Sequence, residues 1–564
     1  MHVPKTIPER SLYFDYPYFA FQPPAEMRGE APRHQAVVVG GGPVGLACAL
    51  ELVRHGVAVT VLEADESVSG GSRAICIARR SMEILQHLGV ADDFARDGLG
   101  WTRGQSFYRD RVVFELEMAH SEDERYLPMT NLQQCLIEDL LVKRVQQVPE
   151  IGVRWQSKVT ALAQDEAGVR LTVDTPEGEY DLAADWVVAC DGARSSLRGL
   201  MGLTLSGTSY EGRYLIADIR LDSSYPTERR AWFDPPANPG STVLMHKQPG
   251  NIWRVDYQLL DEGAVDEELQ ETRIRERIQT QLDMIGETGA WELDWYSLYK
   301  AHCLCLDDYR QGRVLFAGDA AHLVPIFGVR GLNSGFADAN NLGWKLAAVI
   351  RGDAPERLLD SYNAERRPAT LEIFREASKS TVFMTPPSRG YQLMRDAALS
   401  LSIGSDWPRE LINPRQSAPY DYVHSALNSA GAEGAFAGGP RPGAPLSNMA
   451  VRCAGESGHL LDHLGPDFTL LHFGTPDLDP GDLRDDGEAG GRELRWLVVD
   501  GKAPAPAVML EDIGGAARRL YDATAGTVYL ARPDGHVCGR WRQADKEAIA
   551  AAIARARTGG EAAG

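Results

Sequence analysis

Residues Val37–Leu50 read VVVGGGPVGLACAL, which is typical of an apolar strand, a glycine turn and the start of a helix. Gly40, Gly42 and Gly45 have the spacing G-x-G-x-x-G, with Pro43 inside the turn. The first glycine permits the tight turn, the second lets backbone approach a pyrophosphate, and the third lets helix and strand pack closely. The phosphates would lie at the helix N-terminus. The stretch predicts a dinucleotide site, and alone it fits a nicotinamide or a flavin.

A second strand, VAVTVLEA, follows this helix and ends at an acidic residue. Glu63 comes 18 residues after Gly45. A carboxylate at this point can bind a ribose hydroxyl and disfavours a 2′-phosphate. NADPH is therefore a poor fit for this site, whereas FAD and NAD both remain. The register of strand, helix, strand and acid favours dinucleotide binding over a turn without ligand.

Composition limits the class of protein. The chain has 564 residues, of which 44% are hydrophobic, and a formal net charge of −21. Its apolar content is enough for substantial cores, and its acidity argues against nucleic acid or an anionic membrane as partner. No apolar run approaches the roughly 20 residues of a membrane span, and no signal peptide is evident, so we expect a cytoplasmic protein. None of the eight cysteines forms a C-x-x-C pair, and we expect no metal site.

The order of patterns along the chain predicts an α/β fold in several parts. Alternation of apolar and polar residues before residue 300 indicates a mostly antiparallel sheet, and a Pro-, Gly-, Ser- and Ala-rich stretch marks a later boundary. The expected parts are an extended arm (1–33), a nucleotide-binding domain (34–210 and 301–383), an inserted sheet (211–300), a connecting segment (384–440) and a small α/β domain (441–564).

Two further strand-end motifs follow the glycine turn. Asp191 and Gly192 come directly after the strand in YDLAADWVVACDGA, and Gly318 and Asp319 come after the strand in GRVLFAGDAAH. The second motif continues into a loop that contains Pro325 and then into a helix. An aspartate at a strand end can accept a ribitol or ribose hydroxyl. A glycine-rich loop before a helix can present N–H groups to an anionic ring or a phosphate.

The order of these motifs resembles that of a known family. GGGPVG, then C-D-G, then G-D-A-A-H with P-x-x-G-x-x-G-x-N is similar to the signature of class A flavoprotein aromatic hydroxylases, single-component FAD monooxygenases of the para-hydroxybenzoate hydroxylase fold. The resemblance covers residues from about 35 to 380. The tail, with GPRPGAPLSN and VYLARPDGHVCGRW, resembles the thioredoxin-like C-terminal domain of the phenol hydroxylase and 3-(3-hydroxyphenyl)propionate hydroxylase branches. Because it lacks C-x-x-C, we expect packing or dimer contacts from it rather than thiol–disulfide exchange.

The resemblance implies a Rossmann-like FAD-binding domain with an inserted, mostly antiparallel substrate sheet. It implies that FAD is held permanently at the glycine turn and that NADH or NADPH binds transiently. Reduced flavin would take up O₂ as a C4a-hydroperoxide and pass one oxygen to a phenolic ring. The cofactor-binding residues that it implies are Gly40, Gly42, Pro43, Gly45, Glu63, Arg73, Arg80, Gln134, Val159, Asp191, Gly318, Asp319, Pro325, Gly328, Gly331, Leu332 and Asn333. Arg73 and Arg80 could equally be surface charges, and Gln134 a capping residue.

Five residues are candidates for catalysis or substrate binding. Many relatives have glutamine in the glycine loop where this chain has Arg330, which could stabilise anionic flavin, hold a substrate carboxylate or point to solvent. On the inserted sheet, Arg254 could bind a carboxylate, and His246, Tyr257 or Tyr299 could relay a phenol proton. Because side chains alternate along a strand, only about half of these can face the flavin.

Other functions stay open beside aromatic hydroxylation. The segment WELDW does not match the W-x-W-x-I-P motif of flavin-dependent halogenases. The motifs do not distinguish an aromatic hydroxylase from an epoxidase or Baeyer–Villiger oxygenase that acts on a polyketide-like aromatic. They also do not distinguish it from a flavin-binding protein without turnover. The expected partners are a small aromatic substrate and a second copy of the chain, with the homodimer inferred from the family and the aromatic arm.

Overall fold

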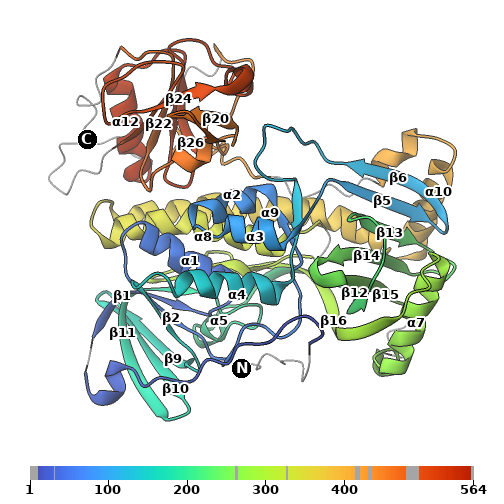
Figure 1. Ribbon diagram of the computed structural model, residues 1–564. Helices are drawn as coiled ribbons and strands as arrows, with labels where there is room; N and C mark the ends of the chain where they lie inside the picture. The colour runs from blue at the N-terminus through green and yellow to red at the C-terminus, as the bar shows by residue number, and fades with distance from the viewer. Residues whose placement is uncertain are drawn as a thin grey trace.

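The structure is a computed structural model that describes residues 11–30, 32–260, 265–325, 328–412, 419–429, 435–477 and 494–560. Figure 1 shows three parts: a central α/β part, an antiparallel sheet at one end of it, and a C-terminal domain that lies over its helices. The chain therefore has the α/β fold class that the sequence predicts.

The central sheet has the strand order β17-β18-β11-β1-β2-β8, with β17 (Arg310–Gln311) and β8 (Ile151–Arg154) at its ends. β10 (Gly168–Thr175) also pairs with β11, and β9 (Lys158–Asp165) pairs with β10. Strand β1 (Arg33–Val39) pairs in parallel with β2 (Val59–Leu62) and β11 (Gly178–Ala189), and β11 pairs in parallel with β18 (Val314–Phe316). The last four residues of β1 are apolar and buried because helices cover this parallel sheet. Among these helices, α1 (Pro43–Arg54) packs closely on α8 (Gly331–Ile350).

The N-terminal arm covers its own chain. Its described residues are extended apart from one short 3-10 helix, and their backbone bonds with Glu66 through Phe19 and with Asp294 through Leu12. The Phe19 ring stacks on Trp155 with centroids 4.1 Å apart. The arm thus joins the central part to the inserted sheet, so its aromatic residues already have a partner within the chain.

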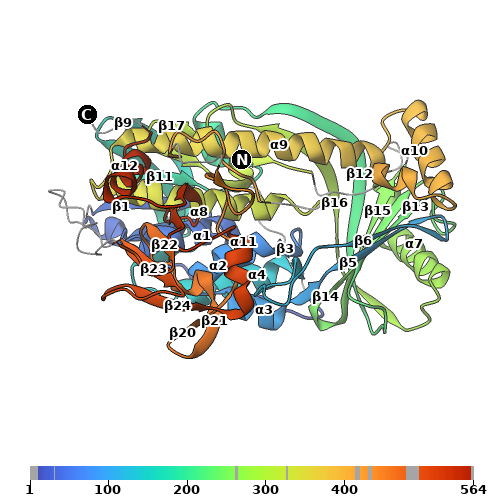
Figure 2. The same ribbon diagram turned by 90° about the horizontal axis from the view of Figure 1, so that it is seen from above.

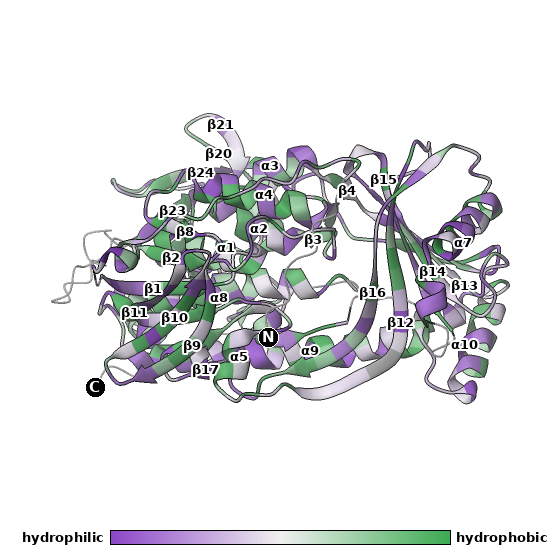
Figure 3. Ribbon diagram, turned by 90° about the horizontal axis from the view of Figure 1, so that it is seen from below, coloured by the Kyte–Doolittle hydropathy of each residue, from purple (hydrophilic) through white to green (hydrophobic). Residues whose placement is uncertain are grey.

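The inserted sheet reaches further along the sequence than 211–300. It contains, in spatial order, β19 (His322–Leu323), β16 (Trp291–Cys305), β12 (Ser206–Leu221), β15 (Ile252–Leu259), β14 (Thr242–Gln248), β13 (Arg229–Phe233), β5 (Arg103–Tyr108) and β6 (Arg111–Glu117). The hairpin of β5 and β6 joins β13 in parallel, a long-range pairing that no local pattern indicates. In Figure 3 the long strands β12 and β16 run side by side from the central part to the far end of the sheet.

Two faces of this sheet have different neighbours. On the outer face, Val243, Val255 and Tyr257 pack with apolar residues of α7 (Glu271–Met284). On the other face, which we call the inner face, Tyr214, Phe233 and Leu244 pack with residues of α9 (Asp360–Met384) and α10 (Arg389–Ser402). Figure 2 shows α9 running along the molecule from the central part to α10. The segment 384–440, expected as a connection, thus contains a helix, and its residues 413–418 and 430–434 lie outside the described ones.

The C-terminal domain has a sheet of order β21-β20-β24-β23-β22-β25-β26, which includes β20 (Ala450–Cys453), β21 (Glu456–His459), β24 (Val508–Asp512) and β26 (Val537–Trp541). Strand β22 (Thr469–Phe473) pairs in parallel with β23 (Arg495–Val499) and antiparallel with β25 (Val528–Ala531), and helix α12 (Lys546–Arg557) closes the domain. A parallel pair beside an antiparallel hairpin with a closing helix is the expected thioredoxin-like arrangement. Its two cysteines, Cys453 and Cys538, are free.

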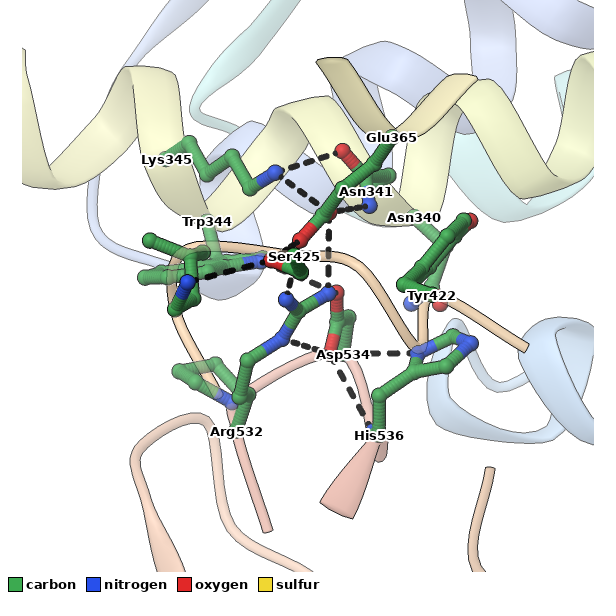
Figure 4. A network of polar contacts seen from close by, with 12 residues as sticks. Asn340, Asn341, Trp344, Lys345, Glu365, Tyr422, Ser425, Arg532, Asp534 and His536 are labelled. Carbon is green, nitrogen blue, oxygen red and sulfur yellow. Dashed lines mark hydrogen bonds and ion pairs between the residues drawn. The ribbon is translucent and has the colours of Figure 1, made fainter. Parts of the chain in front are cut away.

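A buried ionic network joins this domain to α8 and α9 (Figure 4). The Glu365 carboxylate on α9 accepts from Lys345 Nζ at 2.7 Å and from Arg532 Nη1 at 2.5 Å, and Arg532 also pairs with Asp534. These four side chains are at most 1% exposed. Burial raises the pKa of Glu365, but Arg532 and Lys345 outweigh it and hold that pKa below its usual range. The domain is therefore fixed to the helix whose N-terminus approaches the site described below.

Removing the central carboxylate should destabilise the protein strongly. In Glu365→Gln, the buried Lys345 loses its carboxylate partner and the buried Arg532 keeps only Asp534. Breaking a buried pair in this way costs about 3–5 kcal/mol. The matched control is Glu511→Gln, because Glu511 pairs with Arg452 at an exposed site and such pairs contribute about 0–1 kcal/mol. Denaturant unfolding measures both variants. Equal losses in the two variants would contradict the role assigned to the network.

Candidate functional site

Three strand ends meet at one edge of the central sheet. Gly40 directly follows β1, whereas Asp191 and Gly318 lie two positions after the last residues of β11 and β18. A Cβ on Gly40, which has φ +108°, would lie 2.4 Å from the Cys190 carbonyl oxygen. A Cβ on Gly45 would lie 1.9 Å from the Gly40 carbonyl oxygen. Both positions therefore require glycine, and the carboxyl ends of these parallel strands form the crevice in which such folds bind ligands.

Open space lies beside the glycine turn. Gly42 is the N-cap of α1, and neither Gly42 nor Gly192 has any atom within 4 Å of an added Cβ. Pro43 is the first residue of that helix, so no N–H is lost there. Unpaired N–H groups at the start of a helix attract an anion. The space beside Gly42 therefore has the position and the polarity of a phosphate site.

Glu63 lies where the sequence placed it, next to the glycine turn. Its Oε2 accepts from the Gly41 backbone N–H at 2.6 Å, and its Oε1 accepts from the Asp65 N–H at 3.0 Å. The carboxylate is 4% exposed. It is held with its oxygens at the edge of the turn, within the same crevice.

Asp191 and Asp319 line the crevice from the neighbouring strand ends. Asp191 Oδ2 accepts from the Leu197 N–H at 3.0 Å, whereas its buried Oδ1 has no hydrogen-bond partner among the described residues. Burial raises the pKa of Asp191. Burial also raises the pKa of Asp319, although the nearby charges of His322, Arg73 and Arg198 act to lower it. Asp319 is nevertheless open to solvent. A carboxyl surrounded by protein yet solvent-accessible lies in an internal cleft.

The glycine loop ends in the N-terminus of α8. Gly328 has φ +89°, and Gly331 and Leu332 begin the helix, some way after Pro325. The Asn333 side chain accepts from the Ala78 N–H at 2.8 Å and donates to the Cys76 carbonyl at 3.2 Å. The loop is thereby joined to β3 (Cys76–Ala78), on the side of the cleft that the inserted sheet covers.

The remaining predicted cofactor residues differ in what they contact. Arg73 is exposed, and its charge reaches Asp319. Gln134 bonds with Glu138 and with the Ala74 N–H, so it supports the segment that carries Arg73. Val159 is buried in the sheet on β9 (Lys158–Asp165). Arg80 instead pairs with Glu83 and donates to the Asp534 carbonyl oxygen at 3.0 Å, which directs it to the C-terminal domain.

Arg254 is on the inner face, but its guanidinium is already used within the chain. It forms two hydrogen bonds of 2.8 Å to the Asp218 carboxylate, and both side chains are at most 2% exposed. It also donates to the Ser72 and Arg73 carbonyl oxygens. Arg254 therefore ties the inserted sheet to the segment beside the cleft rather than offering a free site for a substrate carboxylate.

The other four substrate candidates divide by strand alternation. His246 is on the inner face, level with Arg254, and Tyr299 is on the same face and donates to the Val324 carbonyl oxygen at 3.0 Å. Tyr257 is on the outer face, in the apolar cluster with α7, because it is one residue out of phase. Burial lowers the pKa of the Arg330 guanidinium, against the attraction of Glu376 and Glu372 on α9. Arg330 thus lies within reach of α9.

Sequence reasoning missed three residues. Asp256 and Arg229 are buried on the inner face, and Arg198 donates to the carbonyl oxygens of Ala320 and Ala193, which joins two strand-end segments. The sequence did contain an indication for Asp256. It lies two residues after Arg254 on β15, so side-chain alternation places both residues on the same face of the sheet. Burial, together with Asp218, raises the pKa of Asp256 to about 7, although Arg254 and Arg229 act against this shift. Arg198 had no sequence signal of this kind.

The comparisons with known proteins agree with this geometry. The FAD binding domain family matches residues 33–377. A para-nitrophenol 4-monooxygenase of a Pseudomonas species (strain WBC-3) is 30% identical over 66% of this chain and 92% of that protein. A 3-(3-hydroxy-phenyl)propionate/3-hydroxycinnamic acid hydroxylase of Mycolicibacterium smegmatis is 28% identical over 89% of this chain and 90% of that protein. A crystal structure of aklavinone-11 hydroxylase in a ternary complex with FAD and aklavinone has a TM-score of 0.73 and 26% identity, and covers 93% of this chain and 99% of that chain.

The chain belongs to the FAD binding domain family, whose match spans more than half of it. It is an FAD-dependent monooxygenase of the aromatic hydroxylase class, as the order of its motifs predicts. The family, the fold class and FAD as cofactor are confirmed. In the part of the chain that the structure describes, no helix is long and apolar enough to cross a membrane. In the same residues, no three His, Cys, Asp or Glu side chains are grouped to hold a metal ion.

The raised pKa of Asp256 should make stability depend on pH. The folded protein keeps the Asp256 proton up to a pH of about 7, whereas an unfolded chain releases it near 4. Stability therefore falls as pH rises through this window, and Asp256→Asn removes that fall. Between pH 5 and pH 8, the variant should gain about 2–3 kcal/mol relative to the parent protein. Denaturant unfolding at both pH values measures this gain. Asp283→Asn, on an exposed position of α7, is the control, and parallel pH profiles for all three proteins would contradict the assignment.

Proposed function

We propose that the protein hydroxylates a small phenolic ring with NADH or NADPH and O₂, and that FAD lies along the three strand ends. The observation that carries this proposal is that three strand ends meet beside the N-terminus of α1, with open space at Gly42, and that the loop leading into α8 is joined to β3 through Asn333. The reaction class is supported by two relatives whose names give a phenol as substrate, the para-nitrophenol 4-monooxygenase and the 3-(3-hydroxy-phenyl)propionate/3-hydroxycinnamic acid hydroxylase.

The residues present fit FAD in shape and polarity. The open space beside Gly42 fits the pyrophosphate at the start of α1, and Glu63 fits a ribose hydroxyl of the ADP half. The unpaired Oδ1 of Asp191 and the solvent-open Asp319 fit hydroxyl groups of the ribitol and its neighbourhood. The loop from Gly328 to Asn333 would then flank the ring system.

When bound, FAD supplies the acceptance of hydride from NAD(P)H and the activation of O₂. The chain contributes position, charge and exclusion of water. The N-terminus of the 20-residue α8 directs its partial positive charge at the ring system and stabilises negative charge there. Cys76, Trp101 and Met129 form an apolar cluster beside the loop that keeps water away from the reacting atoms.

The proposed assembly and location rest on less specific features. A homodimer is supported by exposed apolar side chains on and after α10, such as Met394 at 62% and Trp407 at 70% exposure. Sedimentation of the purified protein measures the assembly, and a monomer would contradict it. A cytoplasmic location is also proposed, because the expected hydride donors NADH and NADPH would be available to the enzyme there.

Substitution of Gly42 should separate folding from FAD binding. A Cβ at Gly42 meets no protein atom within 4 Å, so Gly42→Ala should fold, but the methyl group would enter the space assigned to the pyrophosphate. We expect FAD affinity to fall at least about tenfold, the change that corresponds to 1.4 kcal/mol. Gly152→Ala, which also has free space around its Cβ, is the matched control. FAD titration of the apoproteins gives the answer, and equal affinity in both variants would refute the placement.

The reaction itself is tested with a panel of substrates. Purified holoenzyme receives NADH or NADPH, O₂ and one compound at a time, including 4-nitrophenol, 3-(3-hydroxyphenyl)propionate and a polycyclic phenol. We expect a product heavier by one oxygen and faster NAD(P)H oxidation with at least one single-ring phenol. Oxidation that yields only peroxide with every single-ring phenol, but a hydroxylated polycyclic product, would replace the proposed substrate class by a larger one.

A further inference from the structure

The inner face of the inserted sheet has an ordered arrangement of side chains above the cleft. The registers of β13, β14, β15 and β12 place Ala231, Leu244, Asp256 and Ile216 level with one another. The next level toward β3 contains Arg229, His246 and then the paired Arg254 and Asp218. A single carboxyl thus interrupts an apolar level, and a level that contains two arginines adjoins it.

Three of these side chains are buried without a partner. Arg229, His246 and Asp256 are each 7% exposed. Among the residues that the structure describes, none of them forms a hydrogen bond or an ion pair, and His246 Nδ1 and Asp256 Oδ1 are fully enclosed. Buried polar groups of folded proteins are almost always bonded, so three such groups on adjacent strands indicate that a polar ligand completes them.

The surroundings define that ligand. Ala231, Leu244 and Ile216 offer apolar surface on either side of Asp256. The charge of Arg229 reaches the Cys76 thiol on β3, where burial raises the thiol pKa and Arg229 opposes it. β3 is also the strand to which Asn333 joins the glycine loop. The three groups therefore border the end of the cleft assigned to the flavin ring, and they suit a flat apolar ring with an ionisable oxygen.

The charges around Asp256 come from several elements. Arg229 on β13, Arg254 on β15 and Asp218 on β12 act on its carboxyl, and Tyr214 on β12 faces it from the other side. Burial and the two arginines lower the pKa of His246 to about 3, so this imidazole is neutral at physiological pH. Since Arg254 is neutralised by Asp218, Arg229 is the cation left for a ligand among these groups.

We propose that Asp256 is the catalytic base that ionises the substrate phenol and that Arg229 holds the resulting phenolate. This inference rests on the proposed function. The O–H bond of the phenol breaks, its proton passes to the Asp256 carboxylate, and the electron pair stays on the phenolate oxygen opposite the Arg229 guanidinium. An ionised hydroxyl enriches its ring in electrons, which favours attack by an electrophilic oxygen. After the reaction, the proton returns from Asp256 to the product.

The test uses holoenzyme and 3-(3-hydroxyphenyl)propionate, whose ultraviolet absorption distinguishes phenol from phenolate. At pH 8, where Asp256 has lost its proton and can accept another, the parent protein should bind this probe as phenolate, although the hydroxyl of the free probe is neutral. Asp256→Asn should bind the neutral form. Arg229→Gln should also lose the phenolate spectrum, and Arg229→Lys should partly restore it. FAD content is measured for each variant, and Asp283→Asn on α7 is the matched control.

Turnover of the phenol identified by the panel gives the second measurement. Asp256→Asn should lower kcat/KM by about 100-fold or more near neutral pH and remove the acid limb of its pH profile. Folded, FAD-loaded Asp256→Asn that binds phenolate and keeps kcat/KM within about twofold would overturn the inference while leaving the proposed function intact. If the parent protein binds and hydroxylates no phenol, the proposed function fails first and the inference fails with it.

Discussion

The close approach of helix α1 to the strand ends is the constraint on which the rest of the site depends. An added Cβ at Gly45 would lie 1.9 Å from the Gly40 carbonyl oxygen, and one at Gly40 would lie 2.4 Å from the Cys190 carbonyl oxygen. Only glycine lets the turn pass this closely between its neighbours. The same contact brings the N-terminus of α1 to the crevice, and it sets β1 and β11 so that Asp191 faces that crevice. α8, which packs on α1, carries the glycine loop to its far end.

A second set of contacts holds the substrate side in place. The buried Arg254–Asp218 pair belongs to the inserted sheet, yet its guanidinium also bonds with the carbonyl oxygens of Ser72 and Arg73 beside the cleft. The network around Glu365 fixes the C-terminal domain to α8 and α9. The domain without C-x-x-C therefore contributes rigidity to α8, the helix that begins at the candidate site, which gives a physical role to a part that carries no redox motif.

Local rules predicted the parts of the site that depend on local geometry. The glycine spacing, the strand-end acids and the loop before α8 are short stretches whose chemistry is readable from neighbouring residues, and all of them lie around one cleft. The alternation rule also states correctly that candidates on a strand divide between two faces, as Tyr257 and His246 do. The rule does not predict which of the two faces is turned toward the site, because that depends on which helix packs on which side of the sheet.

The remaining features depend on contacts between distant residues. From the sequence alone, Arg254 is a candidate for binding a substrate carboxylate. The fold pairs it instead with Asp218 on the neighbouring strand, 36 residues earlier in the chain. Arg80 is close in sequence to Arg73 but bonds with Asp534, far along the chain. Asp256 is a charged residue on the same face as Arg254, but its Oδ1 has no hydrogen-bond partner among the described residues. Whether a charged residue on a strand is structural or available to a ligand is thus a property of its three-dimensional neighbours.

The central claim is that the flavin ring lies between the N-terminus of α8 and the inner face of the inserted sheet. A crystal structure of the holoenzyme with a bound phenol measures this directly. We predict the pyrophosphate beside Gly42, the ring system along Gly328 to Asn333, and the phenol oxygen within hydrogen-bond distance of Asp256. A flavin ring outside this cleft, or a phenol whose oxygen faces away from Asp256 and Arg229, would contradict the account.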